Sequence, residues 1–346
     1  MDNPAEFIDW PTRVPTQHIP PQSNENADAL AEAVIDHPAL RIDDHSSAED
    51  LKDHRALESE ICGCRTLLTH SAQRYSELVQ VLPPVIAAAR TAHWCTPESS
   101  TADQLIEAYH IARHFFSATG DSWRAATVAD RAMSIAVHQR QPLLTAASAW
   151  HVAISLLRTQ YPKKGHDYAL AAARRIAEAE IGELEVATLT NALRLVAARA
   201  AATAGAFDES EQLLAALMNS CDAMNLDRYC RGVGFGPTEV AITRMEIAIE
   251  RHDADLTISI AECNCNPDHL PIERQVAYYI CQARAYAQRR DDVEATIALL
   301  RVATLSPEDI TYDSNARECV QYLVRRNNYL TRSEVGRLAS IAGISS

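Results

Sequence analysis

The sequence predicts an all-α fold, arranged as a right-handed solenoid of antiparallel helix pairs. First, alanine is abundant while glycine (10 residues) and phenylalanine (5 residues) are scarce, which favours closely packed helices over a sheet. Second, apolar residues make up 47% of the chain, and helical spacing of these residues continues from about residue 48 to the end. Third, several helix pairs can be superimposed on their connecting turns.

The N-terminal region differs from the rest in charge and pattern. The chain has 346 residues and a net charge of −14, of which residues 1–60 contribute −10. The first 24 residues contain five prolines and little periodic hydrophobicity. We therefore expect residues 1–47 to form an acidic, largely disordered arm with a short helix near 26–37, and residues 48–346 to form the solenoid.

The breaks between helices fall at prolines and glycines such as Pro97, Gly120, Pro142, Gly205 and Pro271. The helices expected between them are 48–71, 73–92, 101–119, 122–139, 143–158, 165–179, 183–204, 207–224, 237–251, 254–263, 271–289, 291–304, 313–327 and 331–342. The last two are expected to cap the solenoid, since an end repeat needs a polar outer face.

The repeat is clearest around Gly120, Gly205 and Arg290. In each case an apolar residue lies four positions before the turn and a small residue five positions after it. Two weaker copies fit with turns near Lys164 and Asp253, which gives steps of 37 to 48 residues. This spacing resembles the tetratricopeptide repeat, whose second helix begins with a small residue because it crosses the first helix closely.

Four segments resemble a known class of regulator: Gly234–Ile242, Glu246–Glu250, Ala283–Arg289 and Leu305–Glu308. They are similar to segments in the tetratricopeptide-like sensor region of Xre-type transcriptional regulators from high-GC Gram-positive bacteria. In that family an N-terminal helix-turn-helix precedes the sensor region. Residues 1–60 lack its sequence pattern, and their negative charge would repel DNA phosphates.

The resemblance implies a regulatory binding module that captures a peptide or protein partner in its concave groove, in transcriptional or developmental control. The alternative is a DNA-binding regulator that acts through an unrecognised helix-turn-helix or one supplied by a partner. The chain itself does not support direct DNA binding. The sequence does not distinguish a monomer from a homodimer.

A row of cations marks the expected groove. His114, Arg158, Arg199 and Arg284 each lie six residues before a turn residue, and Ile247 interrupts the row in the fourth unit. First helices line the groove of a tetratricopeptide solenoid, so these side chains, together with His110, are the predicted partner-binding residues. Arginines can pair bidentately with carboxylates, which favours an acidic or C-terminal peptide as the partner.

Two further sequence patterns, one rich in glycine and one at the C-terminus, can be explained by helix connections and helix starts. The glycine-rich stretch 232–238 precedes a helix, but it lacks the lysine of a Walker loop and no strand is expected before it. We interpret it as a loop between helices, with Thr238 near a helix start. At the C-terminus, Thr331 and Glu334 predict a capping box at the start of the last helix.

Possible metal ligands occur at Cys62/Cys64, at Cys263/Cys265 and at the i, i+4 pair of histidines, His110 and His114. The first thiol pair lies in an expected helix, where alternate residues face apart, and the histidine pair has no evident third ligand. We therefore expect no metal and no cofactor, with the nine cysteines as reduced thiols.

No serine, cysteine or carboxylate arrangement with catalytic spacing stands out, so we expect a binding protein and not an enzyme. The N-terminus has no apolar stretch typical of a secretory signal, and no apolar run reaches the length of a membrane span. The expected location is the cytoplasm.

Overall fold

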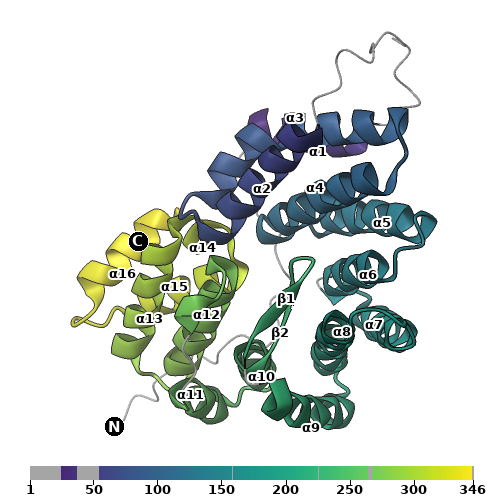
Figure 1. Ribbon diagram of the computed structural model, residues 1–346. Helices are drawn as coiled ribbons and strands as arrows, with labels where there is room; N and C mark the ends of the chain where they lie inside the picture. Colours follow the sequence, from purple (N-terminus) through teal and green to yellow (C-terminus); the bar gives the residue numbers. More distant parts are fainter. Residues whose placement is uncertain (1–24, 37–53, 158, 225, 264–266, 345–346) are drawn as a thin grey trace, which may run out of the picture.

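The computed structural model describes residues 25–36, 54–157, 159–224, 226–263 and 267–344. The expectation of disorder in residues 1–24 therefore lies outside the described residues. The chain is all-α, with one small β-hairpin, and successive helices pack against their neighbours in a manner consistent with a helical repeat (Figure 1). None of the described helices is long and apolar enough to cross a bilayer.

Most helices begin and end within a few residues of the expected positions. The helices are α1 (Glu25–Ile35), α2 (His54–His70), α3 (Arg74–Cys95), α4 (Ser99–Ala118), α5 (Ser122–His138), α6 (Pro142–Leu157), α7 (Pro162–Ala177), α8 (Glu183–Thr203), α9 (Phe207–Met224), α10 (Pro237–Glu250), α11 (Ala254–Glu262), α12 (Ile272–Gln288), α13 (Asp292–Leu305), α14 (Pro307–Tyr312), α15 (Ser314–Arg326) and α16 (Arg332–Ile341). The expected start of a helix at residue 48 lies outside the described residues, and α14 was not expected. The hairpin consists of β1 (Arg228–Cys230) and β2 (Val233–Phe235).

One turn geometry recurs between the paired helices. Gly120, Gly205, His252 and Arg290 all have positive φ and lie two residues before the second helix of a pair begins. In each turn the next backbone N–H donates to the carbonyl five residues earlier, over 2.8 to 2.9 Å. This is the Schellman arrangement that ends a helix through a left-handed residue. The same local solution therefore ends α4, α8, α10 and α12.

The small residues five positions after the turns are buried as the repeat predicts. Ala125, Ser210 and Ala295 have no exposed surface. Their size lets the second helix of each pair approach the first closely. The buried core runs through the whole array and is rich in alanine, which explains why so few large aromatic residues are needed.

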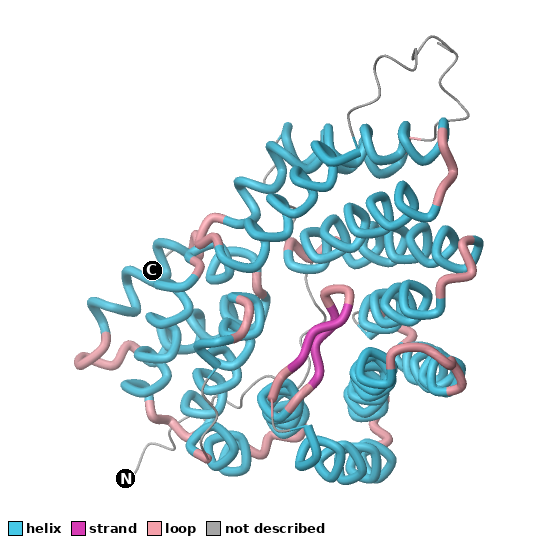
Figure 2. Tube along the Cα trace, viewed as in Figure 1, coloured by secondary structure: helices cyan, strands magenta, loops and turns pink. Residues whose placement is uncertain are grey.

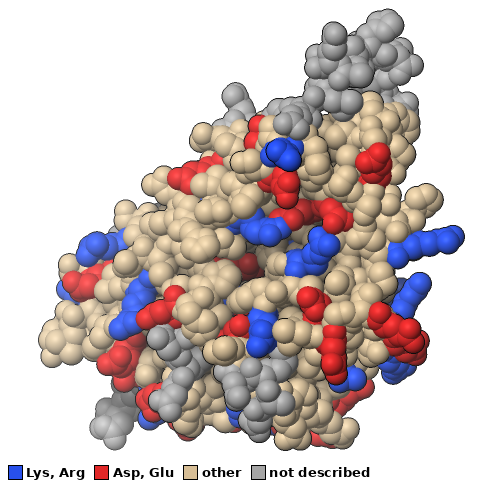
Figure 3. Space-filling view, in the orientation of Figure 1, with Lys and Arg blue, Asp and Glu red and all other residues tan. Residues whose placement is uncertain are grey.

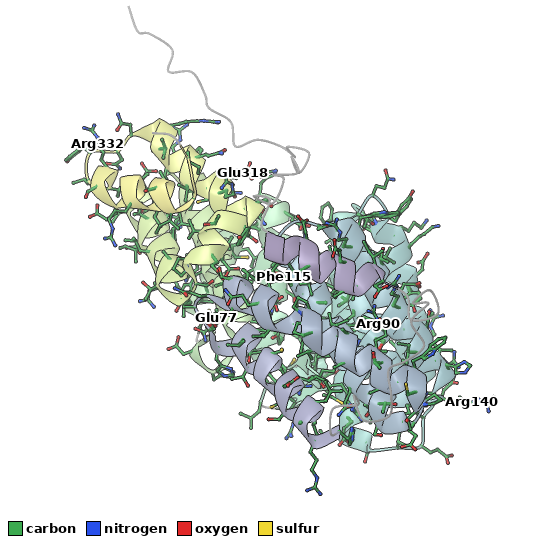
Figure 4. All side chains as sticks on the ribbon, turned by 90° about the horizontal axis from the view of Figure 1, so that it is seen from above. Glu77, Arg90, Phe115, Arg140, Glu318 and Arg332 are labelled. Carbon is green, nitrogen blue, oxygen red and sulfur yellow. The ribbon has the colours of Figure 1, made fainter. Side chains whose placement is uncertain are left out.

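Helix α1 is part of this core. Leu30 and Val34 are almost fully buried, and α1 packs against α3. The guanidinium of Arg90 on α3 donates to the carbonyl of Ala33 over 2.7 Å and pairs with Asp36 over 3.1 Å, which satisfies the C-terminal end of α1. Viewed from above, α1 lies along the helices beneath it, with Arg90 near its end (Figure 4). The short helix predicted at 26–37 is confirmed.

Three local predictions were wrong. The glycine-rich stretch 232–238 is not simply a loop, because it contains β2 of the hairpin and the start of α10. Helix α14 was not predicted; it begins at Pro307, where proline's missing N–H costs nothing because no intrahelical partner is available. Thr331 does precede α16, but its side chain makes no capping hydrogen bond, so the predicted capping box is absent.

The two ends of the array meet. Arg74, at the start of α3, is fully buried and pairs with Asp309 of α14 over 2.7 Å. The carboxylate of Glu308 accepts the backbone N–H groups of Tyr75 and Ser76 over 2.8 and 3.0 Å, and so caps α3 from a distant segment. We call Arg74, Tyr75, Ser76, Glu308 and Asp309 the clasp. Figure 1 shows α14 beside the start of α3, so that the helices enclose a central space.

Candidate functional site

A cavity of about 500 Å³ lies in this central space. The helices that line it are α2, α4, α6, α8, α10 and α12, with contributions from the hairpin and the clasp. None of its described lining residues comes from α5, α7, α9, α11 or α13, the second helices of the pairs. The space-filling view shows a hollow near the centre of the face, with charged side chains of both signs around it (Figure 3).

The structure corrects the frame used to place the cationic row. Helix α7 begins at Pro162 with Tyr161 as its N-cap, so the turn residue of that pair is Gln160 and not Lys164. Helix α11 has Asp253 as its N-cap, so the turn residue there is His252. The frame of the second unit was off by four residues, because Gly165, next to Lys164, lies inside α7 and does not mark the turn.

With the corrected frame, the residues six positions before the turns form a mixed row and not a cationic one. They are His114, Ile154, Arg199, Glu246 and Arg284. The first four line the cavity, while Arg284 does not, because the cavity ends about one helical turn earlier, near Ile280. The predicted site residue His110 also lines the cavity. The side chain of Arg158 lies outside the described residues.

His114 connects two opposite sides of the cavity. Its Nδ1 lies 2.9 Å from a carboxylate oxygen of Glu273, which joins α4 to α12. Burial and the charge of Arg113 lower the pKa of His114, so the neutral ring donates its Nδ1–H to the carboxylate. Desolvation alone would raise the pKa of Glu273, but the His114 contact and the nearby guanidinium of Arg113 hold it well below its usual range.

His110 and His151 form the buried floor of the cavity beside His114. The rings of His110 and His151 stack with centroids 3.8 Å apart. Nε2 of His110 lies 3.1 Å from the hydroxyl of Ser148, and Nε of Arg113 donates to Nδ1 of His151 over 3.0 Å. Burial, reinforced by neighbouring cationic groups, lowers the pKa of both histidines well below 6.5. Both histidines are therefore neutral at neutral pH, and the charge in this part of the wall belongs to the Arg113 guanidinium.

A charged network forms the opposite part of the wall. Arg199 of α8 pairs with Glu246 of α10 over 3.1 Å. Arg274 of α12 donates to Glu239 over 2.8 Å and lies 3.5 Å from Glu246. The hydroxyl of Tyr229 on β1 donates to Glu239 over 3.2 Å. Burial raises the pKa of Glu239, and Arg274 opposes that shift. The network ties three helices and the hairpin together.

The walls carry more negative than positive side chains. Five arginines and seven carboxylates line the cavity. Besides the pairs above, Arg65 contacts Glu107, and Arg231 lies 3.0 Å from Asp103. The groove is thus lined with ion pairs rather than with a stripe of free cations. Such a wall suits a ligand that carries both charges, because each charged group on it has an opposite partner within reach.

Apolar side chains complete the lining. They come from neighbouring first helices and include Trp150, Ile154, Leu195, Val196 and Ile280. Mixed apolar and polar walls around a volume of this size are typical of sites for small organic ligands and short peptides. A pattern of charges in the sequence does not identify these apolar residues, although Ile154 and Arg199 share one register position.

The hairpin enters the cavity from between α9 and α10 (Figure 2). Its two-residue turn, Arg231 and Gly232, has φ values of 52° and 77°, as a type I′ turn requires. Asp227 anchors its base by accepting the N–H groups of Thr238 and Glu239 at the start of α10, over 3.1 and 3.2 Å. At the other end, the Arg231–Asp103 pair ties the tip of the hairpin to α4.

The candidate metal ligands are not gathered together. Within the described part of the chain, no group of three or more histidine, cysteine or acidic side chains has the geometry of a metal site. Cys62 and Cys263 are exposed, Cys64 is buried, and all three are free thiols. Cys265 lies outside the described residues, and His269 pairs with Asp227 over 2.9 Å.

The comparisons with known proteins identify no relative. No family model matches the chain, and no curated protein or solved structure is significantly similar to it. What is shown is an all-helical protein whose helices pack in sequential pairs around a polar cavity.

Proposed function

We propose that the protein is a binding module that captures a short peptide, or a short segment of a protein partner, in the central cavity. The architecture that we propose for it is a right-handed, tetratricopeptide-like solenoid with lengthened repeats. In keeping with the resemblance to regulator sensor regions, the bound peptide would serve as a signal in transcriptional control. A short peptide with free termini carries both charges that the walls can pair with.

One observation carries this proposal. Residues at equivalent register positions of four successive helix pairs, His114, Ile154, Arg199 and Glu246, converge on one cavity. Two of them form an ion pair, one is a neutral hydrogen-bond donor and one is apolar. Concave surfaces built from equivalent positions of successive repeats are the usual binding surfaces of solenoid proteins. Backbone, termini and side chains of a peptide all find complementary groups there.

The test begins with a ligand selected without bias. A random heptapeptide display library is panned against the full chain, and the enriched peptide is synthesised and titrated by calorimetry. Ala277→Trp places an indole in the cavity, because Ala277 lines it, and should weaken binding at least tenfold. Ala303→Trp is the matched control, since Ala303 belongs to the same core region and is also half-buried but does not line the cavity.

A second pair of variants tests the charged wall. Arg199→Ala removes the cation that faces Glu246 and should weaken binding by about five- to hundredfold, which corresponds to about 1–3 kcal/mol. Arg284 has the equivalent register position but does not line the cavity. The Arg284→Ala variant should therefore bind the peptide as tightly as the parent does. Melting temperatures of all variants show whether they are folded. Unchanged affinity in folded Ala277→Trp and Arg199→Ala would contradict the proposal.

A further inference from the structure

The hairpin has a free edge inside the binding cavity. Its pairs are Arg228 with Phe235, Tyr229 with Gly234, and Cys230 with Val233. In a two-residue hairpin the pair next to the turn exchanges hydrogen bonds, and the following pair does not. The N–H and C=O groups of Tyr229 and Gly234 therefore point away from the partner strand, toward the two edges of the ribbon.

The two edges differ in their surroundings. Val233 and Phe235 of β2 have no exposed surface, and β2 packs against α8 and α10. Tyr229 of β1 is 43% exposed and lines the cavity, as does Gly234 beneath its ring. Within the described residues, the backbone N–H and C=O of Tyr229 make no hydrogen bond. The outer edge of β1 thus presents one donor and one acceptor to the binding space.

We propose that the ligand binds as a third strand along β1, in an extended conformation, with its backbone paired to the N–H and C=O of Tyr229. This inference rests on the proposed function and specifies the ligand class. The ligand is a short extended peptide with an unsubstituted backbone N–H near its middle, and not a helical segment. Addition of a strand to an exposed edge is a general mode of peptide recognition, in which main-chain hydrogen bonds supply affinity and pockets for alternate side chains supply specificity.

The surroundings of the edge favour this occupant. Strand residues advance about 3.3 Å each, so the three-residue β1 offers about 10 Å of pairing length. That length matches a short peptide, and a cavity of about 500 Å³ has room for little more. The Arg231–Asp103 pair and the Asp227 cap hold both ends of the hairpin, so its edge is already ordered before a peptide arrives. Pre-ordering lowers the entropic cost of binding.

The experiment uses the peptide enriched from the heptapeptide library and the full chain. Each backbone nitrogen of the peptide is methylated in turn, which removes one N–H donor at a time. The edge offers one acceptor, the C=O of Tyr229, and one N–H of the peptide can pair with it. Methylation should therefore weaken binding strongly at one position and leave the neighbouring positions within about twofold. Equal effects at all positions, or none at any position, would overturn the proposal.

Two protein variants test the edge itself. Tyr229→Pro removes the side chain and the outward N–H, while Tyr229→Thr removes the side chain and keeps the N–H. Both variants lose the hydrogen bond from the Tyr229 hydroxyl to Glu239, so this loss cancels in the comparison. Neither breaks a backbone hydrogen bond between the strands, since Tyr229 belongs to a pair that does not exchange them. Tyr229→Pro should bind about three- to tenfold more weakly than Tyr229→Thr. Equal affinity of the two variants would contradict strand addition.

The outcomes for the two proposals are separate. If Ala277→Trp blocks the selected peptide but the methylation scan shows no single sensitive position, the cavity binds the peptide in another conformation and only strand addition fails. If Ala277→Trp has no effect, the peptide binds elsewhere and the proposed function fails as well.

Discussion

Burial decides the charge of individual side chains in the cavity wall. His110 and His151 stack at 3.8 Å, and their pKa values lie well below 6.5 because burial and nearby cations oppose protonation. His114 is likewise neutral although it contacts Glu273. The sequence pattern predicts His114 as a cation in the groove, whereas in the folded chain His114 is neutral.

This burial predicts a pH dependence of stability. The unfolded chain binds protons at both histidines near pH 6.5, while the folded chain does not, so the free energy of unfolding falls as the pH drops below about 6.5. Between pH 7.5 and 5.5 each histidine should cost on the order of 1 kcal/mol. Denaturant titrations of the parent and of His110→Gln/His151→Gln should show a loss about 2–3 kcal/mol smaller in the variant.

The exposed His138 supplies the control for this comparison. His138→Gln should lose as much stability as the parent does over the same pH range. A double variant that loses as much stability as the parent would show that His110 and His151 are protonated in the folded state.

The residue identities of the site were only partly predictable. His110, His114 and Arg199, which the repeat pattern predicts to face the groove, line the cavity, because one helical face repeats at each turn. That they bind a partner stays a prediction. Their partners were not, since Glu246 and Glu273 come from helices that the sequence does not show to be neighbours. The burial and the ion pairs of these side chains decide the charge of the cavity wall, and both depend on contacts between helices that are distant in the sequence.

At the scale of single elements, helices were predictable and the hairpin was not. Periodic hydrophobicity extends over 14 to 22 residues in most helices, which is enough to identify them. Each strand has only three residues, too few for a pattern. Arg231 and Gly232, which lie between the strand-forming residues Tyr229 and Val233, do indicate a hairpin turn. The indication is weak, because Asn-Gly or Asp-Gly, and not Arg-Gly, is the usual pair in a type I′ turn.

The hairpin base gives a prediction at this scale. A methyl group at Gly236 would collide with the backbone of Asp227, whereas one at Gly63, exposed on α2, would meet nothing. Gly236→Ala should lower the free energy of unfolding by about 1–3 kcal/mol through overpacking. Gly63→Ala should raise it by about 0.5–1 kcal/mol, because alanine favours helix. Chemical denaturation checks both, and a neutral Gly236→Ala would mean that the hairpin base can move.

For the whole molecule, the clasp is what closes the array around the cavity. Arg74 and Asp309 are 235 residues apart in the sequence, and their side chains are only 1% and 8% exposed. Local pattern could predict the helix pairs and their order, but the curvature that brings the ends together is the sum of many small packing angles. Contact between the first and last pairs was therefore beyond sequence reasoning.

The buried ion pair of the clasp should be costly to break. Asp309→Ala leaves the Arg74 guanidinium buried without its partner and should lower the free energy of unfolding by about 3–5 kcal/mol. Asp255→Ala removes one side of an exposed pair with Arg289 and should cost less than about 1 kcal/mol. Arg74→Met/Asp309→Leu should recover most of the loss. Similar small losses in both single variants would mean that the clasp contributes little to stability.

A short peptide bound inside the cavity, against the hairpin, should slow the exchange of the backbone amides that surround it. Hydrogen–deuterium exchange of the full chain, with and without the saturating library-selected peptide, measures this effect. We expect slower exchange in residues 228–235 and in the cavity-lining parts of α8 and α12, with little change in α5, α7 and α13. Protection confined to the outer surface, for example to the Tyr286–Arg301 region of α12 and α13, with an unchanged hairpin, would contradict it.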